Sequence, residues 1–387
     1  MVIKLIIYLA LFLSGISISL NIFIGINGFS FSDGLFLLLY LYFLSNHSFI
    51  AFNVFFFNRF KIIYLLALCL IISLLFGYFF GTFLFSFELK SLFFILRLGY
   101  YFFILMPLIS FLKKEKKIPV IEIMVWGLVF SLLFNWLTAN ISSFFSLPGQ
   151  NSLGYLLSIY LMVIYYEIKN KFFKTILIIS CLISIFFTLS KSAIILEGFF
   201  IFFVLFNNFK QFFTFKKVLI SFLSLVILIN VFKNDIILVW DFLDSVLNTE
   251  ISASEGSESN DQRVKLVLNG LYIGYVYPFG VGSGHYKDAV EATNSVFPVL
   301  WIQPDPHNAF AHIAYSGGII ALVLYFLFLL FGFLKIEKNP NVYILFLFFL
   351  FNGLFHGETL TQNFFYIFFS FYLSKPLINK VENFTYN

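Results

Sequence analysis

The chain has 387 residues, of which 61% are hydrophobic and only 11% charged, with a formal net charge of +5 and a mean hydropathy of +0.96. Soluble domains average about 45–50% apolar and about 25% charged residues. The composition therefore excludes an ordinary soluble domain, and we expect an all-α polytopic membrane protein.

The hydropathy pattern predicts about twelve transmembrane helices, with a range of ten to twelve, because a spanning helix needs about 20 apolar residues. The stretches lie near residues 3–21, 34–57, 62–85, 91–112, 119–140, 151–167, 173–189, 192–209, 217–235, 307–333, 342–357 and 360–374. We interpret the first as a membrane helix rather than a signal peptide, since no convincing cleavage site follows it. Asn46, His47 and Ser48 interrupt the second, so a broken or re-entrant segment is an alternative there.

The distribution of cations predicts the orientation of these helices. With the N-terminus in the cytoplasm and alternating spans, most of the 24 Lys and Arg residues fall on the cytoplasmic side, as the positive-inside rule requires. Both termini are then cytoplasmic. The expected organisation is nine helices in residues 1–235, a large extracytoplasmic loop at 236–306, and three helices in 307–387.

Short helices are expected within the large loop. Ile236–Leu247 could form an interfacial helix, Ser252–Gln262 has the composition of a polar linker, and Arg263–Tyr277 has helical apolar spacing. Gly280, Gly282 and Gly284 then predict a sharp turn. No internal repeat is visible, which argues against transporter folds built from inverted repeats.

Three cations near the outer face are candidate functional residues. Arg97 lies inside the fourth apolar stretch, where a charge costs about 2.5–3.5 kcal/mol on insertion scales and is often functional; snorkelling to the headgroups is the alternative. Arg263 begins the predicted loop helix, and Lys191 lies in a very short outer turn. Their alternatives are an exposed surface residue and an interfacial anchor.

The stretch Gln303–Phe310 is the sharpest local signal. Asp305 is a favourable N-cap and Pro306 a favourable first helical residue, which puts His307 in the first turn of the tenth helix, at the outer surface. The helix dipole there favours a neutral imidazole, which could act as a general base. A capping or interfacial role is the alternative for His307.

Other polar residues give weaker indications. His312 is expected to be structural, and the role of His285 is ambiguous. Glu358, in the last outer turn, either orients a base or faces water. Small residues at Ser316, Gly317 and Gly318 predict close helix packing.

Together these residues suggest a base and several cations facing an anionic lipid carrier, since cations can hold a phosphate or pyrophosphate as it leaves. No carboxylate pair appears on the outer side, so no metal is expected.

Two segments resemble the O-antigen polymerase and O-antigen ligase superfamily (Wzy and WaaL types). The first is an Arg, a short helix, then Pro278 and the Gly280-Val281-Gly282 turn. The second is Pro306-His307-Asn308, which runs into Ser316-Gly317-Gly318. Gln150-Asn151 also resembles the start of a central family helix, and Ser190-Lys191-Ser192 stands where relatives often carry Ser-Arg. Lysine keeps that charge but lacks the bidentate fork.

The resemblance implies a GT-C-like fold and metal-independent, inverting glycosyl transfer without a cofactor. The donor would be an oligosaccharide on undecaprenyl pyrophosphate. By the same resemblance, His307 and Arg263 are catalytic, and the substrate-binding residues are Lys191, Arg97, Asn308, Asn151 and Glu358.

The resemblance also implies a bacterial inner membrane protein whose active site faces the periplasm. Its partners would be membrane lipids and a chain-length regulator, with no nucleic acid. We favour a polymerase over a ligase, because polymerases are the more numerous group. A capsule or exopolysaccharide polymerase would look the same, and a lipid-linked oligosaccharide flippase is the competing class.

Overall fold

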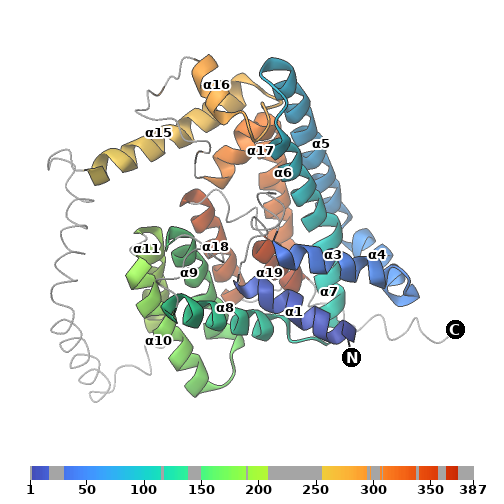
Figure 1. Cartoon of the computed structure of the whole chain (residues 1–387), viewed down its shortest axis with the longest axis vertical. Coiled ribbons are helices and arrows are strands. Elements are labelled where there is room, and N and C mark those ends of the chain that lie inside the picture. Colours follow the sequence, from blue (N-terminus) through green and yellow to red (C-terminus); the bar gives the residue numbers. More distant parts are fainter. Residues whose placement is uncertain are drawn as a thin grey trace.

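The computed structural model describes residues 2–16, 30–114, 117–137, 150–188, 191–207, 255–293, 297, 306, 308–336, 340–355 and 363–373 (Figure 1). Every regular element in these residues is a helix. The described part of the chain therefore agrees with the predicted all-α class.

The first part of the chain contains α1 (Val2–Ile16), α3 (Phe31–Phe43), α4 (His47–Arg59), α5 (Lys61–Leu84), α6 (Leu89–Tyr100), the π-helical turn η1 (Tyr101–Leu105), α7 (Met106–Lys114), α8 (Val120–Leu137), α9 (Gln150–Glu167), α10 (Lys171–Thr188) and α11 (Lys191–Asn207). The second part contains α15 (Glu255–Val276), α16 (Tyr286–Ala292), α17 (Ala309–Lys335), α18 (Pro340–Phe355) and α19 (Asn363–Leu373).

By length and composition, three helical stretches of the described chain could cross a membrane: Lys61–Leu84, Leu89–Lys114 and Ala309–Lys335, the last of which is kinked at Gly318. They occupy three of the predicted spans. The pair α3 and α4 is a fourth candidate, bent by 109° between the two helices. The bend confirms the alternative of a broken second segment.

The apolar helices support a membrane protein, whereas the count of twelve spans stays a prediction. Shorter helices occupy most of the other expected positions, and the stretch 217–235 lies outside the described residues. Helix α5 is apolar on both its faces. It buries Leu70 and Leu74 but exposes 64% of Phe79 and 86% of Phe83, as expected of a helix whose outer face meets lipid.

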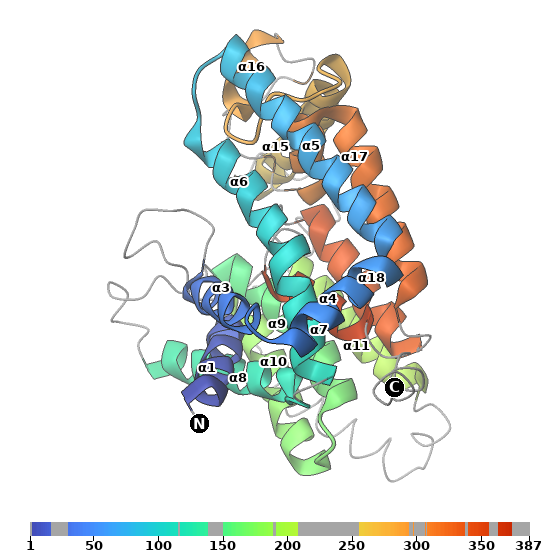
Figure 2. The same ribbon diagram turned by 90° about the vertical axis from the view of Figure 1, so that its right-hand side faces the viewer.

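The helices fall into two regions. Figure 2 shows α5, α6 and α17 standing together, with α15 and α16 at one end beside the connection between α5 and α6. Most of the other helices gather toward the opposite end, where the N-terminus lies. Helix α17 packs along α5 and against α15.

A separate hydrophobic cluster holds α15 and α16 in place. It consists of Leu266, Ile273, Val281, Tyr286, Ala289, Val290 and Tyr315, all nearly fully buried. We call α15, the glycine turn and α16 the cap. Because Tyr315 belongs to α17, this cluster fixes the cap onto the membrane-spanning bundle.

One prediction about the loop is wrong. The stretch Ser252–Gln262 was expected to be a polar linker, but α15 begins at Glu255 and includes most of it. The helix that starts the cap therefore extends further than its apolar pattern indicates. The predicted interfacial helix at Ile236–Leu247 lies outside the described residues.

Candidate functional site

The two sequence segments that carry the family resemblance meet in the structure. The glycine turn runs against a break in α17, where Val281 N–H donates to the carbonyl oxygen of Tyr315 (2.9 Å) and Gly282 N–H to that of Ser316 (3.0 Å). The hydroxyl of Ser73 in α5 donates to the carbonyl of Gly317 at 3.0 Å. A break in a membrane helix frees backbone groups that must be satisfied by neighbours, and the glycine turn and α5 satisfy them here.

Glycine is required at this contact for two reasons. Gly318 has φ +75° and Gly280 has φ +77°, a left-handed conformation that side chains disfavour. A Cβ on Gly318 would also overlap the carbonyl of Pro278, and one on Gly280 would overlap that of Ser316. The small residues near Gly318 therefore make room for the glycine turn as well as for a neighbouring helix.

Helix α17 folds back on itself at Gly318. The rings of Phe310 and Phe326 are stacked with centroids 4.9 Å apart, whereas sixteen residues of straight helix would span about 24 Å. The segment before Gly318 is a short arm that packs beneath the cap, and the segment after it runs along α5. The start of α17 therefore lies beside Phe326 and not on the far side of the bend.

This geometry corrects the predicted start of the tenth helix. The N-cap is Asn308 rather than Asp305, and the first helical residue is Ala309 rather than Pro306. The Asn308 side-chain oxygen accepts from Ala311 N–H at 2.9 Å. Its side-chain NH₂ group donates to the carbonyl of Leu354 in α18 at 2.7 Å. Asparagine suits the N-cap position because its side chain can bond to Ala311 N–H and to the Leu354 carbonyl at the same time.

His307 lies outside the described residues, so its geometry stays a prediction. In sequence it directly precedes Asn308, the N-cap of α17. Glu358 lies outside the described residues as well.

Arg97 lies on the inner side of the bundle, half-buried in α6. Its guanidinium carbon is 5.9 Å from the ring centroid of Phe94, and it interacts electrostatically with Tyr366 of α19. Tyr366 shares a side-chain hydrogen bond with Tyr325, whose ring lies 6.3 Å from that of Phe310. Contacts through tyrosines therefore connect Arg97 to the start of α17, two residues after Asn308.

A second contact joins α6 to the arm of α17. The rings of Phe94 and His312 lie 4.7 Å apart, and the ring of His312 also packs near Tyr315. This agrees with the structural role expected for His312. Arg97 and Asn308 are thus brought into one region by α6, α17 and α19.

The other predicted site residues are placed only by their backbones. Arg263 lies within α15, Lys191 is the first residue of α11, and Asn151 is the second residue of α9. Helices α9 and α11 pack against α18, the helix that Asn308 bonds to. The side chains of these three residues lie outside the described part of the structure, and their meeting at one site stays a prediction.

His285 belongs to the cap. It is 1% exposed, and its Nδ1 lies 3.3 Å from an oxygen of Asp288. Nearby, Gly284 N–H donates to Ser91 of α6 at 2.8 Å, and the hydroxyl of Tyr315 donates to the carbonyl of Ser283 at 2.6 Å. These bonds tie the turn before α16 to both α6 and α17.

The sequence pattern does not indicate a role for Ser91 or for the tyrosines that contact the start of α17. The chain has 21 tyrosines, and nothing local distinguishes Tyr315, Tyr325 or Tyr366 from the rest. Only the packing of distant helices gives them partners. No group of three or more His, Cys, Asp or Glu that could hold a metal ion occurs among the described residues. The expectation of metal-independent chemistry stays a prediction.

The fold and the site indicate a membrane protein that is helical throughout its described residues, with a helical cap at one end. Residues 176–326 match the family model described as O-antigen ligase. The matched range runs from α10 into the part of α17 that follows Gly318, and it includes Lys191, Arg263 and Asn308. The match supports the O-antigen polymerase and ligase superfamily and a role in O-antigen processing. Neither a curated protein nor a solved structure matches the chain.

Proposed function

We propose that the protein is a surface-polysaccharide polymerase of the O-antigen type, which joins oligosaccharide repeat units carried on undecaprenyl pyrophosphate. One observation carries this proposal. The two segments that resemble the superfamily are interlocked through Val281, Gly282 and the break in α17, and both lie within the matched range.

The proposed reaction is a single inverting displacement. His307 takes the proton from a sugar hydroxyl of the acceptor, and that oxygen attacks the anomeric carbon of the donor sugar. The bond between the anomeric carbon and the pyrophosphate oxygen breaks, and undecaprenyl pyrophosphate leaves with the electron pair. A correctly positioned general base contributes about 10²–10⁴-fold to such a step.

Cations would stabilise the leaving pyrophosphate. Arg263 is proposed as the main contact and Lys191 as the second, with Asn151, Asn308 and Glu358 positioning the substrates. Arg97 would be a further contact to the pyrophosphate, because it lies near the start of α17 and keeps a planar, permanently charged group there.

The proposed setting is the inner membrane of a bacterium, with both termini in the cytoplasm and the cap in the periplasm. A chain-length regulator is the proposed protein partner, and no cofactor is needed.

A ligase that transfers the glycan to lipid A-core is the second candidate. The description of the matching family model favours it. The two activities share donor, chemistry and site residues, so they differ only in the acceptor.

Deleting the gene in its host and running lipopolysaccharide on a gel separates these functions. A polymerase predicts core plus one repeat unit in the deletion strain. Core without any repeat unit would identify a ligase, or a flippase if repeat units also accumulate on the cytoplasmic side.

Complementation then tests the site. We expect His307→Ala and Arg263→Ala to express normally but fail to restore the ladder, because either change removes at least two orders of magnitude in rate. His47→Ala and Arg59→Ala, which change the same residue types in α4, should restore it. A full ladder from both site variants would reject the site.

A further inference from the structure

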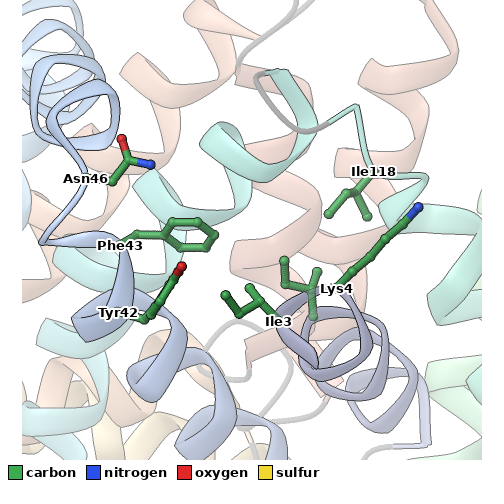
Figure 3. Close-up of a pocket in the computed structure, with 7 residues that line it drawn as sticks. Ile3, Lys4, Tyr42, Phe43, Asn46 and Ile118 are labelled. Atoms are coloured by element: carbon green, nitrogen blue, oxygen red, sulfur yellow. The ribbon is translucent and has the colours of Figure 1, made fainter. Parts of the chain in front are cut away.

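A pocket of about 400 Å³ lies in the region around the N-terminus. It is lined by Ile3, Lys4, Ile7, Tyr42, Phe43, Asn46 and Ile118. Figure 3 shows Tyr42, Phe43 and Asn46 on one side, facing Ile3, Lys4 and Ile118 on the other. Tyr42, Phe43 and Asn46 lie at the 109° bend between α3 and α4, and α3 packs against α1.

The walls of the pocket combine apolar and hydrogen-bond-donating groups. Ile3, Ile7 and Ile118 are aliphatic, and Phe43 is held from behind by Phe111, with ring centroids 5.3 Å apart. An aliphatic chain could therefore lie against a fixed apolar surface.

The polar groups of the pocket suit an anion. The side-chain oxygen of Asn46 already accepts bonds from Ser48 N–H (3.0 Å) and the Ser48 hydroxyl (2.6 Å). Its NH₂ group therefore faces the pocket as a donor. Tyr42 adds a hydroxyl, and Lys4 stands exposed at the rim with its Nζ directed toward Ile118, 5.6 Å from the Tyr8 ring centroid (Figure 3). None of the described residues that line the pocket is acidic.

The surroundings of the pocket are apolar. On the helices that form it, Leu5 is 68% exposed, Leu38 62% and Leu41 55%. Exposed apolar surface of this kind marks contact with lipid in a membrane protein. Further cations stand on the adjoining segment, where Lys114 Nζ lies 5.5 Å from the ring of Phe52 in α4 and Lys117 precedes Ile118.

We propose that this pocket binds one anionic phospholipid. Its phosphate would meet Asn46 and Tyr42 on one wall, the exposed Lys4 side chain would swing from the rim toward that phosphate, and part of one acyl chain would lie against the aliphatic wall. The volume falls in the usual range of small-ligand pockets, about 300–1,000 Å³, so the remainder of the lipid stays in the bilayer. Basic pockets between transmembrane helices bind acidic headgroups for the same electrostatic reason.

Native mass spectrometry of the full-length protein tests this site, with phosphatidylglycerol and phosphatidylcholine of identical acyl chains as probes. We expect the wild type to bind phosphatidylglycerol about fivefold more tightly, the effect of one cation near an anionic lipid. Lys4→Gln should abolish the preference, and Ile3→Trp, which fills the pocket, should abolish binding. Lys61→Gln, an exposed lysine outside the pocket, should change neither.

Equal binding of the two lipids by the wild type would overturn the proposal. So would unchanged binding of phosphatidylglycerol to Ile3→Trp, a variant that keeps every charge and therefore decides the matter even if Lys4→Gln fails to fold. Equal losses in Lys4→Gln and Lys61→Gln would show a general effect of charge rather than a site. None of these results depends on glycosyl transfer.

Discussion

Asn308 connects the start of α17 to the end of α18 with a single side chain. Its oxygen caps the helix through Ala311 N–H, and its NH₂ group bonds to the carbonyl of Leu354. An aspartate could make the first bond but not the second, which explains why an amide suits this position.

Replacing Asn308 by alanine should therefore destabilise the protein. The lost cap costs about 0.5–2 kcal/mol, and the lost bond to Leu354 about 1 kcal/mol more. Thermal unfolding of the detergent-purified protein should show a midpoint lower by several degrees. Asn308→Asp should also destabilise the protein, because it keeps the cap but places a carboxylate oxygen against the carbonyl of Leu354. If Asp305→Ala cost as much as Asn308→Ala, the N-cap predicted from sequence would be the correct one.

Gly318 gives a second prediction at the residue scale, because it combines a left-handed φ of +75° with a contact that leaves no room for a Cβ. Gly318→Ala should cost at least the roughly 1–2 kcal/mol of the left-handed conformation and loosen the cap. Limited proteolysis of the purified protein should then cut in the glycine turn.

Gly198 in α11 is the matched control, since a Cβ there meets nothing within 4 Å. Gly198→Ala should be neutral or stabilising by up to about 1 kcal/mol, the gain of alanine over glycine in a helix. Equal sensitivity of the two variants to protease would contradict the docking of the turn on the α17 break.

At the scale of elements, the sequence predicts α5 and α6 well and α17 poorly. Apolar runs near 62–85 and 91–112 reappear as Lys61–Leu84 and Leu89–Lys114. The run 307–333 also has the hydropathy of one straight span, because the residues on both sides of Gly318 are small or apolar. Its fold-back depends on bonds from Val281 and Gly282, and hydropathy carries no information about such a distant partner.

The same reasoning applies to the candidate site. Family-like residues identified both the glycine turn and the helix start, but not that the two segments bond to each other. Arg97 could be recognised from sequence as an unusual charge at membrane depth. Its neighbour Tyr366 could not, because only the packing of α19 against α7 and η1 brings it there.

At the scale of the whole molecule, the cap stands at one end of the bundle and the N-terminus near the other (Figure 2). The orientation predicted from the lysines, in which the loop that carries the cap is extracytoplasmic, stays a prediction. Lys287 in the cap is 62% exposed, and Lys171 at the start of α10 is exposed in a turn predicted to be cytoplasmic.

Single cysteines at these two lysines test the orientation. The chain has only Cys69 and Cys181, so a background without native cysteines needs two substitutions, both to alanine. In spheroplasts, a membrane-impermeant maleimide should label Lys287→Cys at once and Lys171→Cys only after permeabilisation. The reverse pattern would invert the topology, and it would place the cap, the start of α17 and the proposed reaction in the cytoplasm. Labelling of both positions in intact spheroplasts would instead show that Lys171 and Lys287 face the same side. An even number of spans would then lie between them, and not the three predicted near 173–189, 192–209 and 217–235.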